Sequence, residues 1–383
     1  TQNPLRSKAR WGILRSALLG REFSESAKDA SIHRYQGFQL LGKQHDASLP
    51  EASLNLICAS DYLYFEILAR QCHYGEEGSM NVRFSNSICR SEVKNIREEL
   101  ARRGILAKFD DEHGAANIQW SFSSFTITKY TVCDVIHIYI RERKPKKRIS
   151  LTELQSHDRN CGVDNTGQTC VWDSECTLAH CLGSEDSALS QSLPILSQLS
   201  ENHYIMELGS GMAGIAGLLM AKISPARVIL TDGHPESVEN NRVNICLNML
   251  SNQVSCEKLL WSTDVTVHQE TADLVLCSDC THFEEHHTGL MVTLAHILKV
   301  GGNAILCQPP RAKSLHRFLS LCNRYSTMWK ITHVQEPIIE RKHNESVQDP
   351  FYDPNIHRPC IVLLQKLRVL QDEDRVSFNT QYP

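Results

Sequence analysis

The second half of the chain alternates short apolar runs with stretches of helical periodicity, beginning near Asn202. This alternation is typical of βαβ units, in which helices join parallel strands and cover the sheet. It predicts strands at 203–208, 227–231, 257–260, 273–278, 303–307, 329–334 and 360–364, and helices at 212–222, 235–249, 287–300 and 313–323. Only a polar loop separates the last two strands, so we expect the final strand to be antiparallel.

A glycine-rich turn joins the first of these strands to the first helix. Gly209, Gly211 and Gly214 form the pattern G-x-G-x-x-G between HYIMEL and IAGLLMA. Glycines let a ligand approach the backbone, and a helix N-terminus offers unpaired N–H groups to an anion. Asp232 ends the second strand, where a carboxylate can bind the hydroxyls of an adenosine ribose. The sequence therefore predicts an adenosine cofactor.

The choice of cofactor depends on Glu207, which stands two residues before the first glycine. A carboxylate there is a poor neighbour for a pyrophosphate, but a good one for the ammonium and sulfonium charges of S-adenosylmethionine. Methyl transfer is therefore the preferred function. The alternatives are a nicotinamide-dependent (NAD or NADP) oxidoreductase and a non-catalytic binding protein that keeps the fold. The methyltransferase and the oxidoreductase can be distinguished by which cofactor, S-adenosylmethionine or a nicotinamide dinucleotide, raises the melting temperature.

The run LCSDCTHFEEHH at the end of the fourth strand contains possible zinc ligands. Cys277 and Cys280 have the spacing C-x-x-C, and His282 and His286 follow at distances found in zinc sites. Strand alternation, however, sends the two cysteines to opposite faces of the sheet. We therefore predict no metal site.

Four further side chains are predicted to surround the cofactor or the substrate. Ligands of doubly wound sheets bind beyond the carboxyl ends of the strands, which places Ser278 beside the cofactor and Asp279 beside an accepting amine. Trp172, just before the sheet, can cover the cofactor, and Trp261, after the third strand, can stack on adenine. The alternatives are that Asp279 only caps a helix and that both tryptophans are core residues.

A shift of composition marks residues 82–148. They contain 14 Lys and Arg against 8 Asp and Glu, in a chain whose net charge is −4. Because the sequence on both sides resembles the family named below, we interpret this segment as an atypical basic insertion, either lineage-specific or translated from an intron. The predicted divisions are an N-terminal extension at 1–81, the insertion at 82–148, a catalytic domain at 149–366 and a C-terminal tail at 367–383.

Charge and cysteine content restrict the compartment and the partners. The pI near 6.5 argues against a dedicated nucleic-acid partner, and the chain has no apolar stretch long enough to span a bilayer. Fifteen scattered cysteines suit a reducing compartment better than a disulfide framework. We expect a cytoplasmic monomer, and the cluster RERKPKKR allows a nuclear location as well.

The motifs ELGSGMAGIAGL, LTDG, SDC and DNTGQTCVW, in these positions, resemble the seven-strand, class I S-adenosylmethionine-dependent methyltransferases, and among them the calmodulin-lysine N-methyltransferase family. The resemblance spans roughly residues 10–80 and 150–366. It implies an α/β Rossmann-like sheet of seven strands, the last antiparallel, with an N-terminal α+β extension. It also implies methylation of a calmodulin lysine, as far as the trimethyl state.

The resemblance also implies roles for individual residues. Glu207, Gly209, Gly211 and Asp232 would bind S-adenosylmethionine, and Trp172 and Trp261 would line its site, with Ser278 beside it. Asp279 would begin the D-x-x-(F/Y) motif near the target amine. The fourth position of that motif is His282 here, and an aromatic side chain follows only at Phe283.

An acidic partner such as calmodulin requires a basic surface. Residues 286–335 contain no Asp or Glu, and their six basic residues are Lys299, Arg311, Lys313, Arg317, Arg324 and Lys330. We expect this stretch to form part of the docking face.

Overall fold

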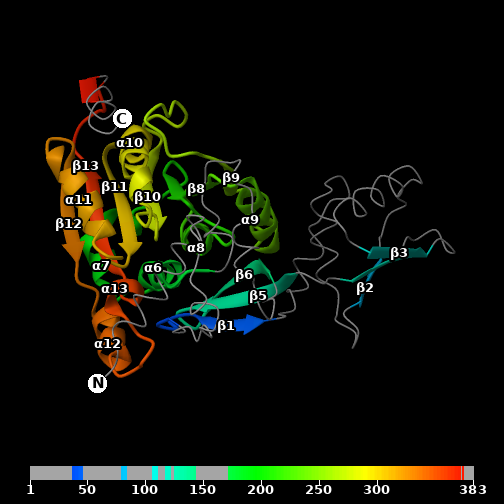
Figure 1. The fold of residues 1–383 in the computed structure, drawn as a ribbon. Coiled ribbons are helices and arrows are strands. Elements are labelled where there is room, and N and C mark those ends of the chain that lie inside the picture. Colours follow the sequence, from blue (N-terminus) through cyan, green and yellow to red (C-terminus); the bar gives the residue numbers. More distant parts are fainter. Residues whose placement is uncertain are drawn as a thin grey trace, which may run out of the picture.

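The computed structural model describes residues 37–45, 79–83, 106–110, 117–121, 125–143, 171–371 and 373–374. Its main body is a seven-stranded sheet in the order β12-β13-β11-β10-β7-β8-β9 (Figure 1). The strands are β7 (Tyr204–Leu208), β8 (Arg227–Asp232), β9 (Val254–Lys258), β10 (Ala272–Ser278), β11 (Leu298–Gln308), β12 (Trp329–Val334) and β13 (Cys360–Lys366). The predicted Rossmann-like α/β fold is confirmed.

The last strand, β13, enters the sheet between β11 and β12 and is antiparallel to both, as predicted. The pairs of β7 with β8 and β10, of β8 with β9 and of β10 with β11 are parallel. The carboxyl ends of β7, β8 and β10 therefore meet at one edge of the sheet, where the glycine turn and Asp279 follow their strands.

Helices cover both faces of the sheet (Figure 1). Alternate strand residues such as Ile205, Leu274 and Ile305 pack on one face with α6 (Asp173–Gly183), α7 (Ala188–Ser192) and α8 (Ile215–Ile223). Their neighbours, such as Met206 and Val275, pack on the other face with α10 (His287–Ile297) and α11 (Ser314–Arg324). Both faces of the sheet are thus buried, which explains the continuous apolar runs of its inner strands.

The remaining helices lie at the two edges of the sheet. Helix α9 (Pro235–Leu247) follows β8, and Figure 1 shows it beside the edge that carries β9. Helices α12 (Pro337–Ser346) and α13 (Pro354–His357) lie between β12 and β13, where a loop without a helix was predicted. That prediction was wrong because Pro337 starts a helix that buries Ile339, and Asp353 caps the second one through the N–H of Asn355. Within the described residues, no helix is long and apolar enough to cross a membrane.

A second, three-stranded sheet joins the main body from the N-terminal side. It contains β1 (Gly42–His45), β5 (Phe125–Val132) and β6 (Ile136–Arg143), all antiparallel. Val132, Ile138 and Ile140 are fully buried in the same apolar cluster as α6 and α8. The strands β5 and β6 lie within the predicted insertion, yet they complete the core of the domain. Within the described residues, β5 and β6 therefore pack as part of the main body.

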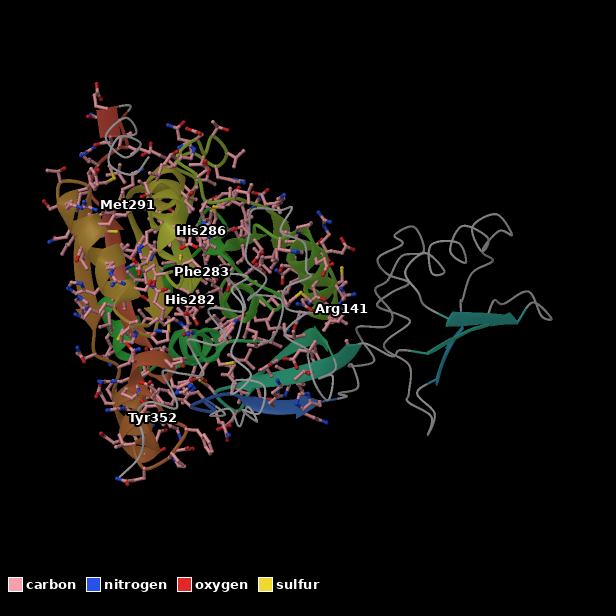
Figure 2. All side chains as sticks on the ribbon, in the orientation of Figure 1. Arg141, His282, Phe283, His286, Met291 and Tyr352 are labelled. Atoms are coloured by element: carbon pink, nitrogen blue, oxygen red, sulfur yellow. The ribbon has the colours of Figure 1, made fainter. Side chains whose placement is uncertain are left out.

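Three asparagines of α9, spaced four residues apart, bind the backbone of β6 through their side chains. Asn248 exchanges two hydrogen bonds with the backbone of Tyr139, at 3.0 and 2.7 Å. Asn244 accepts the N–H of Arg141 at 2.9 Å, and Asn240 donates to its carbonyl at 3.0 Å. These side-chain amides take the place of a neighbouring strand along β6, because they bind the backbone groups that such a strand would bind. Figure 2 labels Arg141 near the end of β6.

A third sheet has the order β2-β4-β3 and consists of β2 (Ser79–Arg83), β3 (Leu106–Asp110) and β4 (Asn117–Ser121). Figure 1 draws it away from the seven-stranded sheet. Residues 1–36, 151–170 and 375–383 lie outside the described residues, and so do most of the predicted N-terminal extension, the motif DNTGQTC and the end of the predicted tail. The division of the chain into four parts stays a prediction.

Candidate active site

The glycine turn after β7 is closed over by side chains from two other loops. Gly209 has a φ of +66°, and a Cβ built on it would lie 3.0 Å from the Trp261 indole and 3.2 Å from the thiol of Cys280. Gly214, with a φ of +59°, is the N-cap of α8, and a Cβ there would lie 2.8 Å from Leu230. Both positions therefore require glycine for conformation and for space.

Asp232 fixes the other side of the turn. Its carboxylate accepts the N–H of Gly211 at 2.9 Å and the N–H of His234 at 2.8 Å. The structure thus brings Asp232 and the glycine turn together, as predicted.

Glu207 lies beneath α8 rather than free in the turn. Its side chain is 1% exposed and accepts the N–H of Gly217 at 2.8 Å. Burial raises the pKa of its carboxyl well above the usual range, and the nearby Glu175 adds to the increase. A nearby cation stabilises the ionised form of a buried acid, and S-adenosylmethionine would bring such a positive charge.

Glu175 is a second buried acid, and it was absent from the predicted site. It reaches from α6 to accept the N–H of Ile215 at 2.6 Å, so it caps a helix whose own N-cap, Gly214, has no side chain. Burial raises the pKa of its carboxyl to about 8. The sequence does contain a signal for such a residue. Gly214 precedes α8 and has no side chain to cap the helix, so a cap must come from elsewhere in the chain.

We expect the burial of Glu175 to make stability depend on pH. Its pKa is raised from 4.5 to about 8 in the folded protein, so its contribution is complete below about pH 4.5 and is lost as the pH rises through about 8. The variant Glu175→Gln keeps an acceptor for Ile215 without the charge. Its melting temperature, without cofactor, should exceed that of the wild type by several degrees at pH 8 and match it at pH 5. Glu201→Gln, at an exposed position, is the control and should follow the wild type at both pH values.

Two polar groups at the carboxyl ends of neighbouring strands have no hydrogen-bond partner among the described residues. They are the hydroxyl of Ser278, at the end of β10, and the side-chain amide nitrogen of Gln308, at the end of β11. Gln308 is fully buried, and its oxygen accepts the N–H of Thr281 at 2.9 Å. Buried polar groups normally have partners, so this edge of the sheet fits a polar ligand. Ser278 was predicted here and Gln308 was missed, although it is the one polar side chain at the end of the apolar run AILCQ.

Asp279 is paired with a cation from the same chain. It follows β10 with a φ of +58°, and its Oδ1 accepts the Nε–H of Arg311 at 2.7 Å while its Oδ2 accepts from Nη2. The guanidinium carbon lies 5.4 Å from the ring centroid of Trp172. Trp172 was predicted to cover the cofactor, and the structure places it against the Asp279–Arg311 pair.

A second carboxylate lies near this pair. Asp173, the first residue of α6, accepts the N–H of Phe38 with both oxygens at 3.1 Å. Burial, with the charge of Asp279 as a smaller cause, raises the pKa of Asp173 to about 6, and the hydrogen bond from Phe38 opposes the increase. The surroundings of Asp279 therefore favour positive charge.

The residues after Asp279 form an aromatic cluster below α10 (Figure 2). The rings of His282 and Phe283 meet edge to face with centroids 4.3 Å apart, and Phe283 lies 6.3 Å from His286. The thiols of Cys277 and Cys280 pack in one apolar cluster, so the prediction that they occupy opposite faces was wrong. The reason is that Cys280 lies beyond the strand end, where alternation no longer applies. Among the described residues, no three His, Cys, Asp or Glu side chains are grouped to hold a metal ion.

Comparison with known proteins shows what part of the chain is similar to. Residues 151–325, slightly less than half of the chain, match the family model described as lysine methyltransferase. This match agrees with the predicted cofactor, so the prediction of S-adenosylmethionine is confirmed. The role of each site residue stays a prediction.

A curated relative and several solved structures are similar to this chain. The calmodulin-lysine N-methyltransferase of Arabidopsis thaliana is 28% identical over 211 residues, which cover 52% of this chain and 66% of the relative, slightly less than two thirds of its length. A methyltransferase from Methanococcus maripaludis is 12% identical, with a TM-score of 0.36, over 59% of this chain and 98% of its own. A sarcosine dimethylglycine methyltransferase from Galdieria sulphuraria is 12% identical, with a TM-score of 0.35, over 52% and 100%.

Proposed function

We propose that the chain transfers methyl groups from S-adenosylmethionine to the ε-amino group of a lysine in calmodulin. The observation that carries the proposal is the Asp279 carboxylate, which holds a cation against the face of Trp172 at the carboxyl end of β10. The family match supports lysine as the acceptor. The Arabidopsis relative, named for its action on calmodulin, supports the protein substrate.

The cofactor would be held by the residues around the glycine turn. Asp232 would bind the ribose, the backbone of Gly209 and Gly211 would lie against the cofactor, and Trp261 would pack beside the adenine. Glu207 and Glu175 are buried acids whose pKa values are raised by burial, and the sulfonium and ammonium charges of the cofactor would favour their ionised forms. S-adenosylmethionine brings an activated methyl group whose transfer needs no nucleophilic side chain from the enzyme.

The acceptor lysine must lose a proton before it can attack. At pH 7.4, neutralising an amine with a reference pKa of about 10.4 requires about 4 kcal/mol. Burial between Asp279 and Trp172 removes water from the amine, which favours its neutral form, while the carboxylate orients the nitrogen. Asp279 and Trp172 would hold the amine nitrogen toward the methyl donor bound at the glycine turn, and the proton that the amine loses would pass to solvent. Alignment at close approach is the main contribution of the protein.

The basic docking face for calmodulin would lie on α11 and β12. Lys313, Arg317, Arg324 and Lys330 are exposed there. Two residues of the predicted face are left out of the proposal, because Arg311 is buried beside Asp279 and Lys299 lies on β11 rather than on α11 or β12. Arg317 pairs with Glu284 but stays exposed. The proposed face is therefore these four exposed residues.

Reversing the charge of the docking face should weaken calmodulin binding. We expect the double variant Lys313→Glu, Arg324→Glu to raise the Michaelis constant for calmodulin roughly tenfold at low ionic strength, and less in high salt, because exposed charges are screened. Arg242→Glu is the matched control, since Arg242 lies exposed on α9 and pairs only locally with Glu239. An equal effect in the control, or none in the double variant, would remove α11 from the docking face.

The direct test is transfer of labelled methyl groups from S-adenosylmethionine to unmethylated calmodulin. The wild type should label calmodulin, and mass spectrometry should find the label on lysine, whereas Asp232→Ala should bind the cofactor weakly and be inactive. No labelling by a wild-type protein that binds S-adenosylmethionine would refute calmodulin as the substrate. Binding of calmodulin without any transfer would favour the non-catalytic alternative.

A further inference from the structure

The position beside Asp279, where the proposed function requires the acceptor lysine, is filled by Arg311 of the same chain. We propose that Arg311 is an internal occupant of the acceptor-lysine site, and that the substrate ammonium displaces it from Asp279. This inference deepens the proposed function and depends on it for the identity of the incoming cation.

The geometry around Arg311 is that of a cation-binding site. The guanidinium is bound in a bidentate manner by Asp279 and lies over Trp172, and only 5% of the Arg311 side chain and 10% of the Asp279 side chain are exposed. A carboxylate and an aromatic face are the two contacts that hold an alkylammonium ion. In the structure, both contacts are made to the guanidinium of Arg311.

This site adjoins the cofactor turn. Cys280, the residue after Asp279, lies 3.2 Å from the Cβ position of Gly209 and donates its thiol to the carbonyl of Leu208 at 3.1 Å. Asp279 is therefore the direct chain neighbour of a residue that packs on the turn where the methyl donor would lie.

The loop that carries Arg311 favours exchange. Arg311, Ala312 and Lys313 have φ values of 41°, 52° and 73°, in the left-handed region that non-glycine residues rarely adopt. Their backbone is held by Asn355 of α13, which accepts the N–H of Arg311 at 2.8 Å and that of Ala312 at 3.0 Å. Strained residues persist only where their surroundings hold them, so release of the guanidinium removes one of the contacts that maintain this loop.

Exchange also keeps Asp279 paired throughout. Removing one partner from a buried ion pair leaves an uncompensated charge and is strongly destabilising. A lysine that entered without displacing Arg311 would instead bring two cations to one carboxylate, where they repel each other. One-for-one replacement avoids both states.

The first test measures binding of n-butylammonium, the end of a lysine side chain, to the full chain. We expect Arg311→Ala to bind this ion at least tenfold more tightly than the wild type in calorimetry, since the variant leaves Asp279 without its cation. Arg311→Ala, Asp279→Asn should lose the gain, and Arg242→Ala, which breaks an exposed pair, should match the wild type. A folded Arg311→Ala protein with no gain would overturn the inference.

A second variant covers the case in which Arg311→Ala does not fold. Arg311→Met keeps an apolar stem against Trp172, and its Michaelis constant for calmodulin should fall about tenfold with little change in kcat. Loss of transfer in a folded, cofactor-binding Arg311→Met protein would overturn the inference, because the arginine would then be required. If the wild type methylates no calmodulin but Arg311→Ala gains n-butylammonium binding, the cation site stands and calmodulin is the wrong substrate.

Discussion

Replacing Ile138 by aspartate is expected to prevent stable folding of the domain that contains the seven-stranded sheet. Ile138 is fully buried in β6, in the cluster shared with α6 and α8, so the variant would place an unpaired carboxylate in the core. Such a substitution costs several kcal/mol, a large part of the stability of an ordinary domain. The measurement is urea unfolding followed by circular dichroism.

A control three residues away makes this result specific. Val135 lies in the turn between β5 and β6 and is 74% exposed, so Val135→Asp should unfold at nearly the wild-type urea concentration. If both variants behave like the wild type, the hairpin is not part of the folded core, and the whole segment 82–148 can be treated as an insertion again.

Replacing Gly209 by alanine should weaken S-adenosylmethionine binding by about a hundredfold or more. The new methyl group would lie 3.0 Å from Trp261 and 3.2 Å from Cys280, so the indole or the turn must move. The left-handed φ adds a strain of about 1 kcal/mol for a residue other than glycine. Calorimetric titration with S-adenosylmethionine measures the loss.

Gly301 offers a matched control for strain alone. Its φ is +86°, and nothing lies within 4 Å of its Cβ position, so Gly301→Ala has the backbone penalty without the collision. We expect it to lower the melting temperature slightly and to leave the affinity for the cofactor unchanged. Equal losses of affinity in the two variants would mean that strain, and not the shape of the turn, explains the effect.

The sequence was sufficient to predict those parts of the site whose residues lie close together in the chain. The glycine turn and Asp232 follow directly from βαβ periodicity, because successive parallel strands bring their carboxyl ends to one edge. The predicted bounds of β9 were wrong: a strand at 257–260 was predicted, and the strand covers Val254–Lys258. An apolar pair at Leu259 and Leu260 suggested strand, whereas only the former is buried.

Contacts between distant segments could not be predicted. Nothing in the sequence connects Asp279 with Arg311, because their pairing depends on how the loop after β11 turns back over β10. The same limit explains Glu175, which caps a helix 40 residues further along the chain. The basic composition of residues 82–148 could not predict the buried residues of β5 and β6, since net charge describes a surface. That this segment is an insertion stays a prediction.

The asparagines of α9 connect two regions of the domain through side-chain hydrogen bonds. Asn244 binds the N–H of Arg141 with its oxygen, and with its nitrogen the carbonyls of Met212 and Ala213, at 2.9 and 3.2 Å. Asn241 donates to the carbonyl of Gly211 at 3.0 Å. One helix thus satisfies the backbone of the cofactor turn and of the N-terminal sheet at once. These two regions consequently form a single cooperative unit, in which neither can open locally while the other stays intact.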